Sequence, residues 1–226
     1  MPTLTFEDLR HAYFLGEQRV PSVTQVLEAS GAMIDFSKIP GPILLQARDR
    51  GTAVHRAAHY WLEGDFDVED FCATFPEYAG YLQSLIRLFD SGQLETVSCE
   101  RRVASPLYQY AGTFDWIGLF NGKAALLDWA TGAPSDVAKD LQTAAYEVAA
   151  REWASLGEDS LLADFFAAHP KPLQRVAVRL LKDGALPKLE PYADPRHFSE
   201  FRTLLAAMQI VARRRGDWIN VVGDAA

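Results

Sequence analysis

Cysteine, long apolar runs and targeting segments are scarce in this sequence of 226 residues. Its two cysteines, Cys72 and Cys99, lie far apart with no CxxC pair, which excludes a disulfide framework and a cysteine-ligated zinc or iron–sulfur site. No apolar run approaches the ~20 residues that span a bilayer, and the first residues have neither the basic nor the apolar region of a signal peptide. We therefore expect a cytoplasmic protein in a reducing compartment, with no membrane partner.

Several well-known site motifs are also absent. The sequence has no GxSxG nucleophile elbow and no GxGxxG fingerprint, and GLFNGKA has a shorter interval between its glycines than the GxxxxGK phosphate-binding loop. These absences exclude serine hydrolase, dinucleotide-binding and P-loop functions. A net charge of −8 argues against nonspecific coating of nucleic acid, although it allows a local basic groove.

The chain has no internal repeat, low-complexity tract or flexible linker, so we expect one domain. Within it we distinguish an N-terminal helical extension (1–50), a core (51–182), and a C-terminal hairpin and helix (183–226). The periodicity predicts helices over 22–27, 42–48, 52–64, 78–89, 136–156, 161–168 and 198–211, strands over 96–103, 113–120, 123–130 and 175–182, and a short edge strand after Asp183-Gly184. The core order is α-β-β-β-α-β, which predicts an α/β fold with a central mixed sheet flanked by helices.

One predicted hairpin brings two carboxylates together. Asn121-Gly122 lies between two apolar runs and is a strong signal for a two-residue type I′ turn, in which both residues have positive φ. The register that follows from this turn places Asp115 directly opposite Asp128. Because like charges in opposed positions are destabilising, we expect a cation between them.

The surroundings of Asp115 and Asp128 favour a metal site. Both strands are otherwise apolar on both faces, as in strands buried under helices. A solvated position near a strand end is the ordinary alternative for one aspartate, but a buried pair is costly unless it binds a metal or shares a proton. Hard carboxylate ligands favour Mg²⁺ or Mn²⁺.

His55 is a candidate third ligand. A helix capped by Thr52 would place His55 near its positive end, which disfavours imidazolium and leaves a neutral nitrogen as a ligand. His55 and His59 also have the i, i+4 spacing of a zinc site, but HRAAH has Arg56 where a zinc protease has its general base, and no third ligand follows. A core or surface histidine is the alternative.

A further polar group lies on the predicted helix over 136–156. Gln142 and Tyr146 are spaced i, i+4 and share one helix face beside Lys139. They could line a site in front of the sheet, and a solvated helix face is the alternative.

In their order and spacing, these residues resemble the motifs of the PD-(D/E)XK nuclease superfamily, nearest its RecB-like exonuclease branch. The opening YFLGEQRVPSVTQVLEASG is similar to phage and prophage members. The matching segments lie within residues 50–146 and are RGTAVH, Glu100, GTFDWIG, LLDWATG and LQTAAY.

The resemblance implies a restriction-endonuclease-like αβββαβ core, with residues 51–182 as the catalytic part. It implies that His55, Asp115 and Asp128 bind one or two divalent ions, Mg²⁺ or Mn²⁺. The other residues that it implies near the site are Gln142, Tyr146 and the carboxylate of Glu100.

One motif residue departs from the family. The family pattern is DWKTG, and this chain has DWATG, with Ala130 in place of the lysine that is thought to orient the attacking water and stabilise charge on the phosphate. Position 130 lies two residues from Asp128 on the same strand, so its side chain points to the same face. A single loss in an otherwise complete motif set favours deliberate replacement of the lysine over natural degeneration.

The resemblance therefore implies a Mg²⁺-dependent deoxyribonuclease, an exonuclease acting on DNA, that is inactive or impaired as written. Two alternatives remain: a noncatalytic DNA-binding or assembly module with a degenerate nuclease fold, and a metal-dependent hydrolase of a non-nucleic substrate, which predicts no DNA binding in Ca²⁺. Candidates for a phosphate-tracking groove are Arg48, Arg50, Arg101, Arg102 and the acid-free stretch 171–182.

Overall fold

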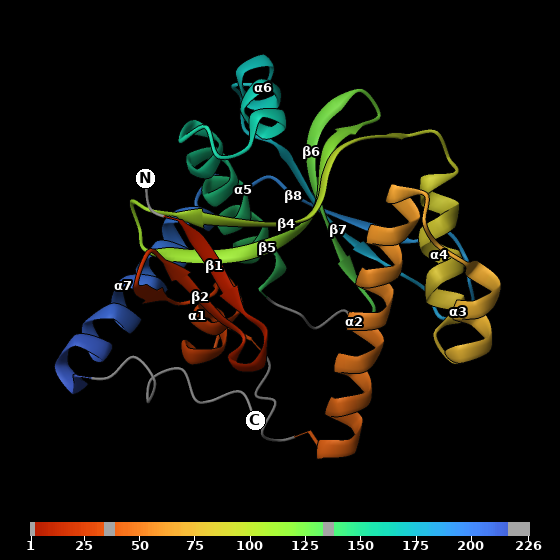
Figure 1. The fold of residues 1–226 in the computed structure, drawn as a ribbon, viewed down its shortest axis with the longest axis horizontal. Coiled ribbons are helices and arrows are strands. Elements are labelled where there is room, and N and C mark those ends of the chain that lie inside the picture. Colours follow the sequence, from red (N-terminus) through yellow and green to blue (C-terminus); the bar gives the residue numbers. More distant parts are fainter. Residues whose placement is uncertain (1–2, 34–38, 133–137, 217–226) are drawn as a thin grey trace.

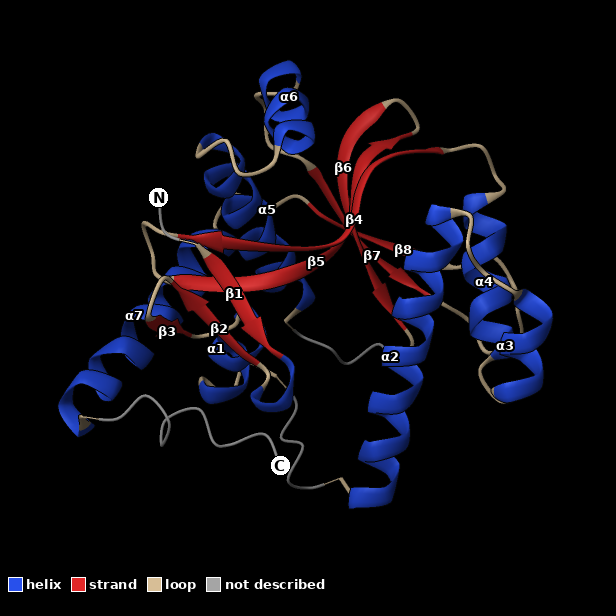
Figure 2. Ribbon diagram, in the orientation of Figure 1, coloured by secondary structure: helices blue, strands red, loops and turns tan. Residues whose placement is uncertain are grey.

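A five-stranded sheet forms the centre of the computed structural model, which describes residues 3–33, 39–132 and 138–216. Helices lie on both sides of this sheet (Figure 1, Figure 2). Its strands, in spatial order, are β4 (Leu94–Ser105), β5 (Tyr110–Phe120), β6 (Lys123–Ala130), β7 (Gln174–Arg179) and β8 (Lys188–Tyr192). The predicted fold class, α/β with a mixed sheet flanked by helices, is confirmed.

The sheet combines antiparallel and parallel pairing. Strands β4, β5 and β6 form an antiparallel meander, β7 is parallel to β6, and β8 is antiparallel to β7 at the edge. A parallel step needs a crossover connection, which α5 (Lys139–Ser155) and α6 (Ser160–Ala168) provide. The predicted first turn of α5 lies partly outside the described residues.

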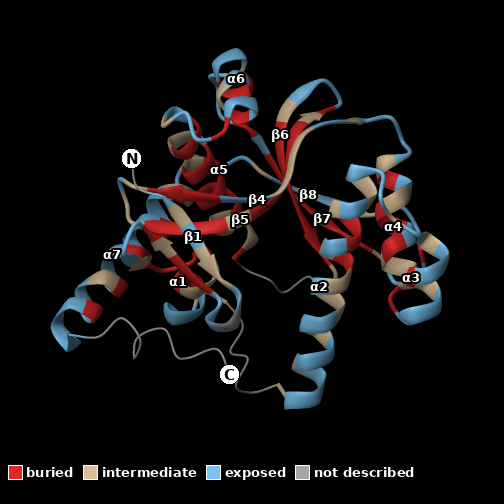
Figure 3. Ribbon diagram, in the orientation of Figure 1, coloured by how far each residue is buried: buried red, intermediate tan, exposed pale blue. Residues whose placement is uncertain are grey.

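Two apolar layers hold the helices against the sheet. On one side, α5, α6, α1 (Val23–Ala29) and α7 (His197–Arg215) bury a core that includes Tyr110 and Phe201. On the other side, α2 (Gly41–Glu63) and α4 (Ala79–Phe89) cover a core that includes Trp116 and Trp129, and α3 (Val68–Thr74) packs beside α4. Figure 3 shows these buried segments lying along the sheet and exposed segments at the periphery.

The N-terminal part is more than the helical extension that we predicted. Before α1, the chain forms a separate three-stranded antiparallel sheet from β1 (Leu4–Glu7), β2 (Ala12–Leu15) and β3 (Gln18–Val20). These strands are too short for their period to be recognised in the sequence, and they gain stability by packing on β5, where the Tyr13 hydroxyl lies 2.8 Å from Thr113 Oγ1. Helix α1 begins as predicted at Ser22, whose side chain forms a capping box with Gln25.

The helix α2 is continuous where we predicted two helices with a break at Gly51-Thr52. Gly51 has no positive φ, and glycine inside a helix costs only about 1 kcal/mol, which the rest of a long helix offsets. Pro42 in the first turn and Gly64 at the C-cap, with φ 75°, are consistent with the observed ends. The N-terminal half of α2 extends away from the sheet and is largely exposed (Figure 3).

The described C-terminal part agrees with the sequence. Strand β8 is the predicted edge strand, and Pro191 within it lies at the edge, where a missing donor is tolerated. Helix α7 follows it and packs on α5. Among the described residues, the longest helices are too polar to cross a membrane.

Candidate metal centre

The β5–β6 hairpin has the predicted turn and register. Asn121 and Gly122 have φ of 51° and 71°, as a type I′ turn requires. The ladder runs from this turn back to Trp116 in the predicted pairing. Asp115, the next residue of β5, continues the contact with its side chain, because its Oδ2 accepts a hydrogen bond of 2.6 Å from the backbone N–H of Trp129. The Asp115 carboxylate is therefore fixed against β6.

Glu100 adds a carboxylate from the neighbouring strand β4. Its two sequence neighbours pair with the two neighbours of Asp115, so Glu100 and Asp115 lie opposite each other. Glu100 has a φ of 48°, a left-handed conformation that costs a non-glycine residue on the order of 1–3 kcal/mol and is often found at functional sites. Its Oε1 lies 3.0 Å from Nδ1 of His55.

His55 reaches both carboxylates from α2. Its Nδ1 lies 3.0 Å from Glu100 Oε1 and 3.3 Å from Asp115 Oδ1. Burial would lower the pKa of His55, but the negative charges of Asp115 and Glu100 raise it well above its usual value. The predicted effect of the helix dipole is wrong, since α2 begins at Gly41 and His55 lies in its interior.

The ligand atoms of His55, Glu100 and Asp115 lie within 4.8 Å of one another, close enough to hold one metal ion. The predicted ligands His55 and Asp115 and the carboxylate of Glu100 thus come together from α2, β5 and β4. Asp128, the third predicted ligand, is adjacent to this group, and its charge contributes to raising the pKa of Glu100.

Asp128 is buried on β6, with 1% of its side chain exposed. Its Oδ2 lies 2.5 Å from Nζ of Lys139, the first residue of α5. The Lys139 ammonium thus satisfies Oδ2, whereas Oδ1 has no hydrogen-bond partner among the described residues. A buried carboxylate with an unsatisfied oxygen suits a metal ligand.

The two predicted residues of α5 lie at this site. Gln142 donates a hydrogen bond of 3.0 Å from Nε2 to the hydroxyl of Tyr146. Burial, with a contribution from the charge of Asp128, raises the pKa of Tyr146, so the solvated-face alternative is wrong for this residue. A Cβ at Gly112 would lie 2.6 Å from the Tyr146 ring, which shows how closely β5 approaches that ring.

Ala130 ends β6 and brings no polar group to the site. Its side chain is buried, and it follows Asp128 by two residues, so both point to the same face of the strand. Its carbonyl accepts a hydrogen bond of 2.8 Å from the N–H of Leu180. Position 130 is therefore paired with β7 and apolar.

Only two of the four positive charges predicted to form a phosphate-tracking surface in 171–182 are exposed, Lys171 and Lys182. Arg175 and Arg179 are both buried. Arg179 pairs with Glu190 at 2.7 Å, and Arg175 lies 3.9 Å from Glu147. Because side chains alternate along a strand, both arginines point to the face on which neighbouring elements provide carboxylates.

The other candidate arginines have mixed surroundings. Arg101 pairs with Asp159 at 2.8 Å, while about half of the Arg101 side chain is exposed. The guanidinium of Arg102 lies over the ring of Phe6 at 4.5 Å from its centroid, and that of Arg50 lies over Tyr81 at 5.2 Å. A role in DNA binding stays a prediction for these residues and for Arg48.

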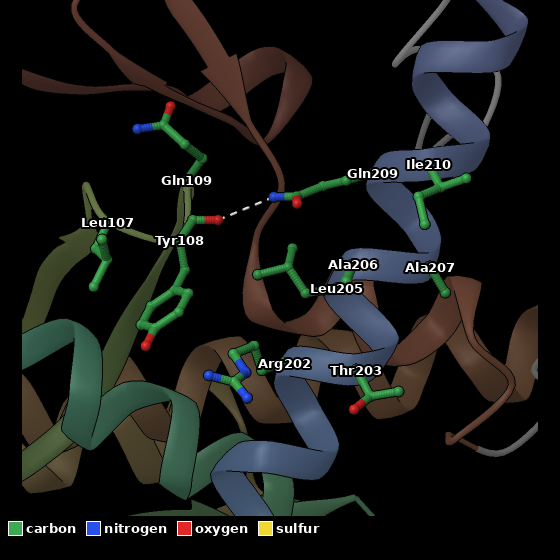
Figure 4. Close-up of a pocket in the computed structure, with 10 residues that line it drawn as sticks. All are labelled: Leu107, Tyr108, Gln109, Arg202, Thr203, Leu205, Ala206, Ala207, Gln209 and Ile210. Carbon is green, nitrogen blue, oxygen red and sulfur yellow. Dashed lines mark hydrogen bonds between the residues drawn. The ribbon is translucent and has the colours of Figure 1, made fainter.

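A surface cavity of about 680 Å³ lies elsewhere, between α7 and the turn that joins β4 to β5 (Figure 4). Gln209 donates a hydrogen bond of 3.0 Å to the carbonyl of Tyr108 across it. None of the predicted site residues and no carboxylate lines it; the lining residues are Leu107, Tyr108, Gln109, Arg202, Thr203, Leu205, Ala206, Ala207, Gln209 and Ile210. This cavity is therefore separate from the carboxylate cluster.

The raised pKa values of two carboxyls predict how stability depends on pH. Burial raises the pKa of Glu100 to about 7 and that of Asp128 to about 6, above their ordinary values of 4.5 and 3.8. The folded protein thus retains protons that the unfolded chain releases at lower pH, so their contribution to stability is lost as the pH rises through about 6 to 7. We expect the melting temperature of the metal-free protein to fall between pH 5 and pH 8.

Calorimetry on the wild type and on the Glu100→Gln/Asp128→Asn variant would measure this fall. The amides do not titrate, so the variant should have a flatter pH profile. Equal slopes in the two proteins would contradict the assignment of the effect to these carboxyls.

The chain is similar in structure to a solved protein. No family model and no curated protein matches the chain. A crystal structure at 2.19 Å of a protein from Eubacterium rectale, provisionally described as an exonuclease, is similar over 88% of this chain and 82% of that one. The sequence identity is 11% and the TM-score is 0.48. The interpretation of the site therefore depends on its own residues.

Proposed function

We propose that this chain is a metal-dependent deoxyribonuclease, acting as an exonuclease, that hydrolyses phosphodiester bonds. The observation that carries the proposal is the row of acidic side chains on three adjacent strands, Glu100, Asp115 and Asp128, with His55 against it. Buried carboxylates, with Asp128 Oδ1 unsatisfied among the described residues, and one imidazole are suitable ligands for Mg²⁺ or Mn²⁺. The family resemblance of the motifs supports DNA as the substrate.

In this proposal His55, Asp115 and Asp128 hold the metal. A bound divalent ion would activate water and neutralise charge on the scissile phosphate. Glu100 holds the His55 ring in place through Nδ1, which fixes the direction of the imidazole. Gln142 and Tyr146 form a hydrogen-bonded wall of the site on α5.

Ala130 affects the expected rate of DNA cleavage. The family that the motifs resemble has a lysine amine at this strand position, and its absence here predicts an impaired enzyme. That prediction holds if no other amine reaches the reacting phosphate. Whether Ala130 is natural or introduced makes no difference to this chemistry.

Metal binding is the first property to test. Binding to the native state should raise the melting temperature in Mg²⁺ or Mn²⁺, because the ion relieves repulsion among the carboxylates. Asp128→Ala should abolish the rise, whereas Asp65→Ala, which removes an exposed carboxylate, should leave it intact. An unchanged response in Asp128→Ala would remove Asp128 from the ligand set.

The reaction is tested on end-labelled single-stranded, duplex and flapped DNA with Mn²⁺, using the wild type and Ala130→Lys. Metal-dependent cleavage by either protein supports the nuclease proposal. DNA binding in Ca²⁺ without cleavage by either protein would favour the noncatalytic module instead. Metal binding with no DNA binding at all would favour a hydrolase of a non-nucleic substrate.

A further inference from the structure

We infer that Lys139, at the start of α5, supplies the amine that β6 lacks at position 130. The inference rests on the proposed nuclease function and names a catalytic residue for it. It follows from one juxtaposition: the Lys139 ammonium contacts the carboxylate of Asp128, which lies two residues before Ala130 on β6.

The position of Lys139 satisfies the geometric requirement for this role. Its Nζ lies 2.5 Å from Asp128 Oδ2, and 17% of its side chain is exposed. Asp128 and Ala130 point to the same face of β6, so the amine lies on the face at which a lysine at position 130 would project. Lys139 and a lysine at position 130 are therefore alternative ways of placing one positive charge at one site.

The rest of α5 supports the same orientation. Lys139, Gln142 and Tyr146 follow the i, i+3, i+7 spacing and share a helix face. Thr143 Oγ1 donates a hydrogen bond of 2.8 Å to the Lys139 carbonyl. Arg175 donates one of 2.8 Å to the carbonyl of the next residue, so the start of the helix is held from two sides.

The absence of a second amine at position 130 also fits. A lysine there would bring another ammonium to the face on which Lys139 meets Asp128, and two like charges in a buried site are unfavourable. With alanine at position 130, the carboxylate of Asp128 meets one cation.

The reaction that Lys139 would assist is hydrolysis. The oxygen of water forms a bond to phosphorus, one P–O ester bond breaks, and the products are a phosphomonoester and an alcohol. Water gives up a proton to solvent, and the departing oxygen takes one from solvent. The ammonium of Lys139 keeps its protons and donates hydrogen bonds to a nonbridging phosphate oxygen, where negative charge increases in the transition state.

The test compares the wild type with Lys139→Met, the double variant Ala130→Lys/Lys139→Met, and Ala130→Lys. Lys123→Met, at the exposed first residue of β6, is the matched control. Three quantities are measured: single-turnover cleavage of end-labelled DNA in saturating Mn²⁺, the Mn²⁺ affinity by calorimetry, and the melting temperature without metal.

We expect the wild type and Lys123→Met to cleave DNA and Lys139→Met to cleave it about 10²–10³-fold more slowly. The Mn²⁺ affinity of Lys139→Met should be equal to that of the wild type or higher, because a competitor for Asp128 is gone. A merely structural lysine would instead lower the melting temperature without changing the rate at saturating metal. The double variant should regain at least tenfold in rate, since its amine comes from β6.

Three results would overturn the inference. One is a wild-type rate in folded Lys139→Met. Another is a wild type that does not cleave DNA together with an Ala130→Lys variant that does, a result that would leave the nuclease proposal intact. The third is a folded, Mn²⁺-binding double variant that does not regain activity, a test that remains available if Lys139→Met does not fold. If every protein binds Mn²⁺ and leaves all DNA intact, the proposed function itself fails, and the inference fails with it.

Discussion

Replacing Asp115 with asparagine should abolish metal-dependent cleavage of DNA, with a loss of at least about a thousandfold. Asp115 lies on the central strand of the acidic row, between Glu100 on β4 and Asp128 on β6. Its Oδ1 faces His55 at 3.3 Å and its Oδ2 is fixed by the N–H of Trp129 at 2.6 Å. The substitution removes the charge on which the metal site depends.

Asparagine is the informative replacement for Asp115 because it keeps the volume and one oxygen acceptor for Trp129. The fold should therefore persist, and calorimetric titration with Mn²⁺ should show the loss of binding directly. The pKa of His55 should fall in the same variant, since the charge of Asp115 is a main cause of its increase, and an NMR titration of the imidazole would measure this.

Asp90→Asn, at an exposed carboxylate after α4, is the control for Asp115→Asn. It should bind Mn²⁺ and cleave DNA as the wild type does. Wild-type Mn²⁺ affinity in Asp115→Asn would exclude Asp115 as a ligand.

The parts of the site that the sequence predicted depend on local rules. A type I′ turn at Asn121-Gly122 fixes the register of β5 and β6 without reference to the rest of the chain, and this register brings Asp115 to β6. The i, i+4 spacing of Gln142 and Tyr146 likewise predicts a shared helix face, which their hydrogen bond confirms. Turn chemistry and helix period were sufficient for these residues.

The parts that the sequence did not predict depend on contacts between elements. The left-handed backbone of Glu100 has no signal in a β-prone run, and the ion pair of Lys139 with Asp128 joins a helix start to a strand. The spacing of Lys139 from Gln142 indicated a shared helix face, but not the carboxylate that Lys139 meets. Glycine is a weak helix former, so the sequence predicts a helix break at Gly51. The long helix around Gly51 keeps it helical, and this effect is not visible from the local sequence.

The burial of Arg175 likewise could not be predicted from the local sequence, because it depends on contacts with α5, with the segment before α7 and with α7. It donates hydrogen bonds of 2.8 Å to the carbonyl of Asp140 on α5 and 3.0 Å to that of Asp194, and its Nη2 lies 3.2 Å from His197 Nδ1. Its Nε lies 3.9 Å from Glu147. A basic residue in an alternating strand therefore acts as a cross-link inside the protein.

Arg175→Met should lower the free energy of unfolding by about 2–4 kcal/mol, because it leaves the carbonyls of Asp140 and Asp194 without their donor and each unsatisfied buried acceptor costs about 1–3 kcal/mol. Methionine retains much of the apolar volume, and Glu147 keeps its ion pair with Arg151 at 3.1 Å, so the loss reflects the unpaired carbonyls. Urea unfolding monitored by circular dichroism would measure it. Arg202→Met, at an exposed position on α7, should change stability by less than about 0.5 kcal/mol.

The same substitution has a consequence for the site. Arg175 holds the carbonyl of Asp140, the residue after Lys139, so its loss should loosen the first turn of α5. Under conditions where Arg175→Met remains folded, we expect slower DNA cleavage with nearly unchanged Mn²⁺ affinity, because Asp115 and His55 lie on other elements. A loss of stability below about 1 kcal/mol would contradict the cross-linking role, since even a single net hydrogen bond contributes that much.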